Sequence, residues 1–127
     1  MYCEITKNIR IEVEPAYLPE QSQPHSNYYY FSYKVKITNL RDSTVQLLNR
    51  YWLIIDGNGM SHEVKGPGVV GHQPQLSPGE SFEYSSFCPL PTPTGNMRGS
   101  YEMAGENNEL FDVKIPLFFL RDLRQVH

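Results

Sequence analysis

Apolar side chains alternate with polar ones along most of this chain, and that alternation restricts the fold more than any other feature. Isoleucine or valine occupies every second position of residues 9–13, and aromatic or aliphatic side chains do the same in residues 31–37. A period of two sends successive side chains to opposite faces of a strand, so one face is buried while the other meets water. No segment has the 3.6-residue period of an amphipathic helix, and the sequence therefore argues against a helix bundle.

Turn residues divide the alternating segments into about seven strands. The predicted strands are residues 9–14, 31–38, 45–55, 60–65, 81–85, 97–103 and 111–117. Asp-Gly-Asn-Gly at 56–59 and Gly-Glu-Asn-Asn at 105–108 are predicted hairpin turns, because glycine and asparagine accept positive φ angles. The pattern predicts an all-β fold, an antiparallel β-sandwich of the fibronectin type III or immunoglobulin-like kind. We expect residues 1–127 to form a single domain.

Parity within these strands predicts which side chains form the core. The last strand should bury every second residue from Phe111 to Leu117, and the residues from Phe118 to His127 should form one turn at most. Pro116 lies inside that strand and belongs at a sheet edge or a bulge, since proline cannot donate a hydrogen bond to a neighbouring strand. Trp52, in the most apolar strand, is expected in the core.

Charge and cysteine content exclude several classes of protein. The chain has 11 Lys and Arg against 14 Asp and Glu and no basic stripe, so a nucleic-acid partner is not expected. Two cysteines are too few for a disulfide scaffold. The first residues lack the apolar stretch of a signal peptide, and no apolar run is long enough to span a membrane. We therefore expect a cytoplasmic protein with reduced thiols and no membrane partner.

Residues that could carry catalysis or bind a metal are present but do not form a recognisable pattern. His62 and His72 are ten positions apart, and no close pair of Cys or His residues has zinc-ligand spacing. Ser85, Ser86 and Cys88 lie near a strand end with no histidine paired to them by sequence, and Cys88 is expected to be a semi-buried, inert thiol. The sequence predicts no enzyme activity, no metal site and no cofactor.

A glycine-rich block follows the fourth predicted strand. Gly66, Gly68 and Gly71 fit the spacing G-x-G-x-x-G, but the prolines that follow argue against the helix that a dinucleotide-binding fold requires. Two interpretations remain: the glycines let the loop turn sharply, which we favour, or their amides form a concave nest that binds an anion. In the second interpretation, Lys65 and Arg98 would add positive charge.

Tyrosines gather at the start of the second predicted strand. Alternation places Tyr29, Phe31 and Tyr33 on the core face and leaves Tyr28 and Tyr30 on the outer face. Outward tyrosines suit protein recognition, because they offer a large contact area at a low cost in side-chain entropy. Cross-strand packing of aromatic side chains on the outer face is an equally good explanation.

Several longer segments match a known family. They are residues 13–22 (Val-Glu-Pro-Ala-Tyr-Leu-Pro-Glu-Gln-Ser), 50–54 (Arg-Tyr-Trp-Leu-Ile), the glycine-rich block 63–74, and 92–103, which starts Thr-Pro-Thr-Gly-Asn-Met-Arg-Gly. In order and over nearly the whole chain, these segments resemble the bacterial ApaG family. The resemblance implies a fibronectin type III-like sandwich, no set of catalytic residues, and a loose link to cobalt and magnesium resistance. In eukaryotes the same domain is attached to an F-box protein and to a DNA polymerase delta-interacting protein, where it looks like a protein-interaction module.

We therefore expect a non-catalytic binding module that engages another protein. The expected contact surfaces are the loop from Gly66 to Gly71 with His72 and Gln73, and the outward Tyr28 and Tyr30. One alternative is a regulator that binds a small anion or nucleotide, such as pyrophosphate or a diadenosine polyphosphate, through the glycine loop. Another is a factor in cobalt or magnesium homeostasis. The chain should be a monomer or a weak dimer, since exposed sheet edges can pair.

Overall fold

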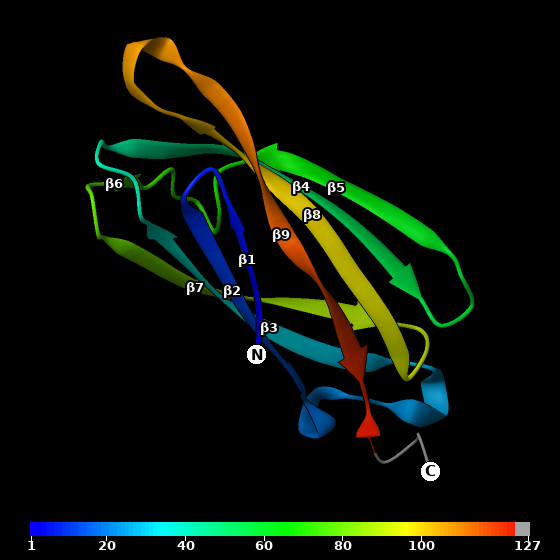
Figure 1. Ribbon diagram of the computed structural model, residues 1–127. Coiled ribbons are helices and arrows are strands. Elements are labelled where there is room, and N and C mark those ends of the chain that lie inside the picture. The colour runs from blue at the N-terminus through cyan, green and yellow to red at the C-terminus, as the bar shows by residue number, and fades with distance from the viewer. Residues whose placement is uncertain (124–127) are drawn as a thin grey trace.

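The computed structural model describes residues 1–123 and consists of two antiparallel β-sheets packed face to face (Figure 1). The strands are β1 (Tyr2–Thr6), β2 (Ile9–Tyr17), β3 (Tyr29–Asn39), β4 (Val45–Asp56), β5 (Ser61–Pro67), β6 (Gln75–Leu76), β7 (Ser81–Leu90), β8 (Thr94–Ala104) and β9 (Leu110–Arg121). Short 3₁₀ turns cover Pro19–Gln21, Pro24–Ser26 and Glu106–Asn108. Within this part of the chain, no helix has the length and apolar character needed to cross a membrane.

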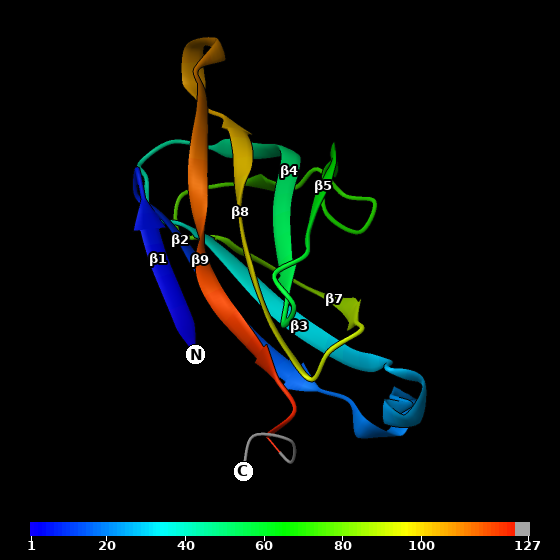
Figure 2. The same cartoon turned by 90° about the vertical axis from the view of Figure 1, so that its right-hand side faces the viewer.

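The strand order is β1-β2-β3-β7 in the first sheet and β5-β4-β8-β9 in the second, where β6 also pairs with β4. The strands of the two sheets cross at an angle, which Figure 2 shows most clearly. This arrangement confirms the predicted antiparallel sandwich. The residues described form nine strands where the sequence predicted about seven, because β1 and the two-residue β6 were not predicted.

Alternation predicted the core correctly in most strands. Phe31, Tyr33, Val35 and Ile37 of β3 are buried, as are the inward residues of β2 and β8. Trp52 is only 3% exposed, and its ring meets the Tyr33 ring at 5.3 Å and the Phe118 ring at 5.9 Å. Ring pairs at such distances add to the stabilisation that burial alone provides.

The prediction for the last strand was correct for Phe111, Val113 and Ile115 and wrong from Leu117 onward, and a bulge is the reason. Met97 pairs with Phe118 and Gly99 with Ile115, so Pro116 and Leu117 together face only Arg98. The extra residue inverts the parity, which buries Phe118 and leaves Leu117 41% exposed. Pro116 does sit at a bulge in an edge strand, as predicted. The strand continues to Arg121 instead of ending in a turn; residues 124–127 lie outside the described part.

The two long sides of the sandwich differ. On one side, β9 packs beside β1, and the Lys114 amide donates a hydrogen bond to Oγ1 of Thr6 at 3.2 Å. On the other side, β5 and β7 are the outer strands of their sheets, and every residue of β5 except Gly66 is exposed. We call this second side the open edge.

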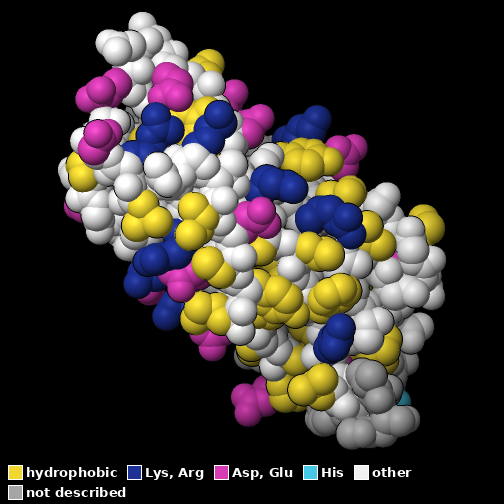
Figure 3. Space-filling view, in the orientation of Figure 1, with side chains coloured by type: hydrophobic (Ala, Val, Ile, Leu, Met, Phe, Trp, Pro, Cys, Tyr) yellow, Lys and Arg dark blue, Asp and Glu magenta, His cyan; other side chains and the backbone are white. Residues whose placement is uncertain are grey.

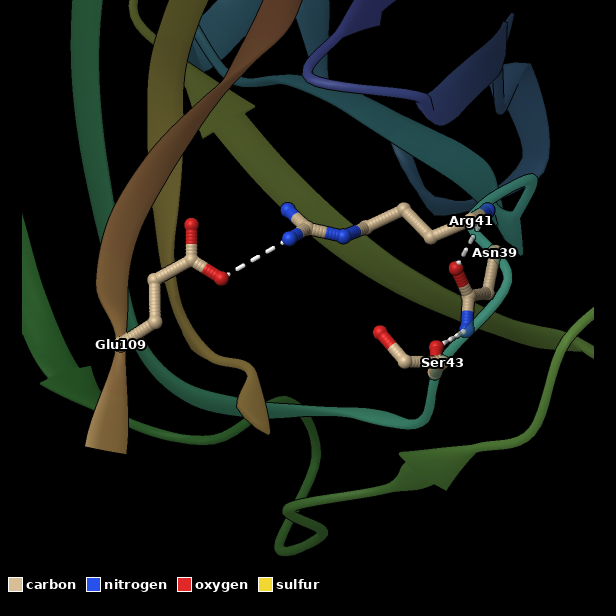
Figure 4. Close-up of polar contacts among 4 residues, drawn as sticks. All are labelled: Asn39, Arg41, Ser43 and Glu109. Carbon is tan, nitrogen blue, oxygen red and sulfur yellow. Dashed lines mark hydrogen bonds and ion pairs between the residues drawn. The ribbon is translucent and has the colours of Figure 1, made fainter. Parts of the chain in front are cut away.

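One end of the sandwich is fastened by a polar cluster (Figure 4). Arg41 reaches from the loop after β3 to Glu109 beside the β8–β9 hairpin, at 2.8 Å between Nη2 and Oε1, and its guanidinium lies 4.5 Å from the Phe111 ring. The Asn39 amide donates to the carbonyl oxygens of Ser43 and Leu76. These contacts hold the β3–β4 loop and the projecting hairpin together.

Candidate functional site

A pocket of about 260 Å³ opens between the sheets at the open edge. Its walls come from strands β3, β4, β5, β7 and β8 and from the loop after β5, and Arg50 is the only charged side chain that lines it. Along β4 the inward positions are Arg50, Trp52 and Ile54, so the lining changes from cationic to aromatic to aliphatic over roughly 13 Å. We call this cavity the open-edge pocket.

Arg50 is held by the glycine-rich segment that faces it. Gly66 pairs with Arg50 across β4 and β5, and a side chain at Gly66 would begin 2.9 Å from the Arg50 Nη2 atom. The missing side chain thus leaves room for the guanidinium. Arg50 Nη1 donates hydrogen bonds to the carbonyl oxygens of Pro67 at 2.9 Å and Gly68 at 3.0 Å. None of the ion pairs within residues 1–123 gives Arg50 a carboxylate partner.

Buried tyrosine hydroxyls lie near the Arg50 end of the pocket. The hydroxyls of Tyr84 and Tyr101 share a hydrogen bond, and Tyr101 is fully buried. Burial raises the pKa of both phenols, and it raises the pKa of Tyr33 as well, although a hydrogen bond with Ser86 opposes that last shift. The three groups therefore stay neutral at physiological pH and can donate hydrogen bonds.

The Tyr84–Tyr101 pair yields a first prediction. Tyr84→Phe should lower the free energy of unfolding by about 1–3 kcal/mol, because it leaves the buried Tyr101 hydroxyl without its partner. The double variant Tyr84→Phe/Tyr101→Phe should lose less than the sum of the two single losses. Urea unfolding of the four proteins measures this coupling, and additive losses would contradict it.

The glycine loop is a tight turn fastened to β4. Gly68 and Gly71 have φ angles of +62° and +82°, and a side chain at Gly68 would overlap the His72 carbonyl oxygen. The amide of Gly68 donates to Leu48 at 2.8 Å, and Val69 and His72 exchange amide hydrogen bonds. The loop leads to β6 and not to a helix. This confirms that the glycines allow a sharp turn, and the Gly68 and Val69 amides that a nest would offer are already engaged.

The other residues predicted around this loop do not converge on it. Arg98 pairs with Leu53, which lies three positions along β4 from Arg50, a distance of roughly 10 Å. The Arg98 side chain donates a hydrogen bond to the Asn96 side chain at 3.2 Å. The Lys65 ammonium lies 5.6 Å from the Tyr51 ring on the outer face of the second sheet.

His72 and Gln73 both have partners within the protein. The His72 ring contacts the Phe82 ring at 5.9 Å, and the Gln73 side chain donates to the Leu48 carbonyl oxygen at 2.9 Å. Both residues therefore help to hold the loop in place.

Three aromatic rings are stacked on the outer face of the first sheet. Tyr28 and Tyr30 face outward, as predicted; their ring centroids are 5.8 Å apart, and Tyr30 stacks on Phe87 at 5.5 Å. Tyr28 is 39% exposed and Phe87 is 54% exposed. We call these three residues the aromatic strip. Sequence reasoning omitted Phe87 from the site, although its position next to the inward Cys88 indicates an outward side chain.

The groups able to perform catalysis are dispersed or shielded. Cys88 is 4% exposed, and burial raises the pKa of its thiol to about 11, so the thiolate is scarce at neutral pH. No cluster of three or more His, Cys, Asp or Glu residues suited to a metal ion occurs within residues 1–123; His127 lies beyond them. On the face shown in Figure 3, acidic and basic side chains are interspersed and do not segregate by sign.

Fold and site together define an open antiparallel β-sandwich in which an arginine of one sheet binds a glycine-rich turn, and the other sheet carries an exposed aromatic strip on its outer face. A family model described as the ApaG domain matches residues 19–105. The chain belongs to this ApaG domain family.

Relatives and solved structures agree with this assignment. A protein named Protein ApaG from Allorhizobium ampelinum is 55% identical to this chain over 99% of this chain and 98% of that protein. A second Protein ApaG, from Agrobacterium fabrum, is 57% identical over 94% of this chain and 92% of that protein. The crystal structure of a putative ApaA protein from Bordetella pertussis is 50% identical, with a TM-score of 0.87 over 89% of this chain and 92% of that one. The C-terminal domain of wzt shares only the fold. It is 12% identical to this chain, with a TM-score of 0.54 over 94% of this chain and 76% of that one.

Proposed function

We propose that the protein is a non-catalytic binding module whose partner is another protein, and that the partner contacts the aromatic strip. The observation that carries this proposal is the stack of Tyr28, Tyr30 and Phe87 on an outer sheet face, with Phe87 more than half exposed. Aromatic side chains contribute most to the binding energy of protein interfaces when a partner covers them.

The position of the strip favours a protein partner over a small ligand. The rings form a surface on the edge strand β7 and on the start of β3, which suits contact with another surface better than enclosure of a molecule. Mutual stacking also holds the three rings in place before binding, and this reduces the entropy lost when a partner docks.

The shielded Cys88 thiol and the scattered histidines support a role without catalysis. Ser86 lies within hydrogen-bonding reach of Tyr33, and none of the hydrogen bonds within residues 1–123 joins it to a histidine or a carboxylate. The engaged loop amides give little support to an anion or nucleotide site at the glycine turn, and Arg98 lies too far along β8 to assist one. We therefore do not include a nucleotide or a metal in the proposed function.

Affinity capture from the native source tests the proposal through variants. Phe87→Ala and Tyr30→Ala should each reduce recovery of the same partner at least about tenfold, which corresponds to about 1.4 kcal/mol of binding free energy. Leu110→Ala is the matched control, because Leu110 is 63% exposed and lies on the β8–β9 hairpin, away from the strip.

All three variants should remain folded at the temperature of the capture, since Phe87 and Leu110 are exposed and Tyr30 is half-buried on the outer face of the sheet. Equal recovery of partners by Phe87→Ala, Tyr30→Ala and the parent would contradict the proposal. So would a loss of capture by Leu110→Ala alone.

A further inference from the structure

The open-edge pocket is lined by charged, polar and apolar groups that play no part in the proposed binding at the aromatic strip. One end holds the Arg50 guanidinium and neutral tyrosine hydroxyls, and the other end is formed by Ile54 and Met97. A cavity that is cationic at one end and apolar at the other is complementary to a molecule with an anionic head and an apolar body. We propose that this pocket binds a small organic carboxylate with an aromatic or aliphatic body.

Arg50 retains hydrogen-bonding capacity for such an anion. Its two hydrogen bonds to Pro67 and Gly68 both come from Nη1, whereas a guanidinium carries five N–H donors. Carbonyl oxygens stabilise the guanidinium without neutralising it, and no carboxylate of residues 1–123 pairs with it. A carboxylate is the planar anion that matches the guanidinium fork, and such pairs are strong when partly desolvated.

The size of the pocket selects among anions. A volume of about 260 Å³ lies just below the range of about 300–1,000 Å³ that is usual for drug-sized ligands. A dinucleotide would therefore not fit, whereas a molecule of the size of phenylacetate would. Val64 and Val70 line the pocket and are 38% and 54% exposed, so the entrance is apolar and open to solvent.

Trp52 provides a built-in probe, because it is the only tryptophan and it lines the pocket. Benzoate and phenylacetate should change its fluorescence in a saturable way, with affinities about tenfold higher than those of benzamide and phenylacetamide. Sodium chloride at the same ionic strength serves as the control for a general salt effect. The neutral amides separate recognition of the charge from recognition of the ring.

Two sets of variants locate the binding. Arg50→Gln should abolish the preference for carboxylates over amides. This change also removes the contacts that hold the glycine loop, so a second test uses a site outside those contacts. It compares Val70→Asp with Val70→Asn, because aspartate and asparagine are nearly identical in shape. Val70 is exposed and has a φ of +42°, a region that both new residues tolerate better than valine. The aspartate should weaken phenylacetate binding about fivefold relative to the asparagine, by charge repulsion at the entrance.

Three results would overturn the inference. The first is the absence of any saturable Trp52 response to carboxylates up to millimolar concentrations. The second is equal affinity for the acids and their amides, and the third is unchanged affinity in Arg50→Gln. The test does not depend on the protein partner, since it uses the isolated chain. Failure of either proposal therefore leaves the other intact.

Discussion

Replacing Phe118 with alanine should lower the free energy of unfolding by about 3–5 kcal/mol. Phe118 is fully buried, and its ring meets those of Tyr2, Tyr33 and Trp52, so it joins β9 to both sheets. Truncation removes the transfer free energy of the ring and leaves a cavity that the surrounding strands can fill only in part. Chemical denaturation monitored by Trp52 fluorescence measures the change.

Leu117, the residue before Phe118, provides the control for this substitution. Leu117→Ala should change the free energy of unfolding by only about 0.5 kcal/mol, because Leu117 is 41% exposed. Unbroken alternation from Phe111 would place Leu117 in the core and Phe118 outside. A larger loss for Leu117→Ala than for Phe118→Ala would therefore show that the bulge at Pro116 is absent.

Gly99→Ala should be the second most damaging change, with a loss of about 3 kcal/mol or more. A methyl group at Gly99 would overlap the Tyr51 carbonyl oxygen and lie 3.2 Å from the Trp52 α-carbon. Both obstacles are backbone atoms of β4, which cannot rotate away as a flexible side chain can. The two strands would have to separate along the central pairing of the second sheet.

Gly59→Ala is the matched control for this change, since both substitutions reduce the entropy of the unfolded chain in the same way. Gly59 has no atom within 4 Å of the new methyl group but has a φ of +83°, so its cost should be about 1 kcal/mol. Thermal melting of both variants gives the comparison. A loss at Gly99 no larger than that at Gly59 would contradict the close approach of β4 and β8.

The sequence predicted the fold class and most of the core, because strand parity is a local property. Tyr28 and Tyr30 were assigned correctly to the outer face for this reason. Parity failed after Pro116, where one extra residue is inserted opposite β8 while the apolar pattern continues unbroken through Leu117. β6 was not predicted either, because two residues are too few to show a period.

The candidate site was harder to predict, because it depends on pairing between distant segments. Phe87 joins Tyr30 only through the β3–β7 register, and Arg50 meets Gly66 only through the β4–β5 register. The glycine spacing indicated a turn. It could not show that Arg50 binds the carbonyl oxygens of Pro67 and Gly68, seventeen and eighteen positions later, since no local pattern encodes this contact.

The most direct test of the proposed function is photo-cross-linking in the native host. A benzophenone-bearing amino acid placed at Phe87 or Tyr28 should yield a discrete adduct with the same partner protein, whereas the same group at Leu110, which is 63% exposed, should not. Mass spectrometry of the adducts identifies the partner and the contact position. Adducts at Leu110 but not at Phe87 or Tyr28, or no adduct at either strip position, would contradict the assignment of the aromatic strip as the binding surface.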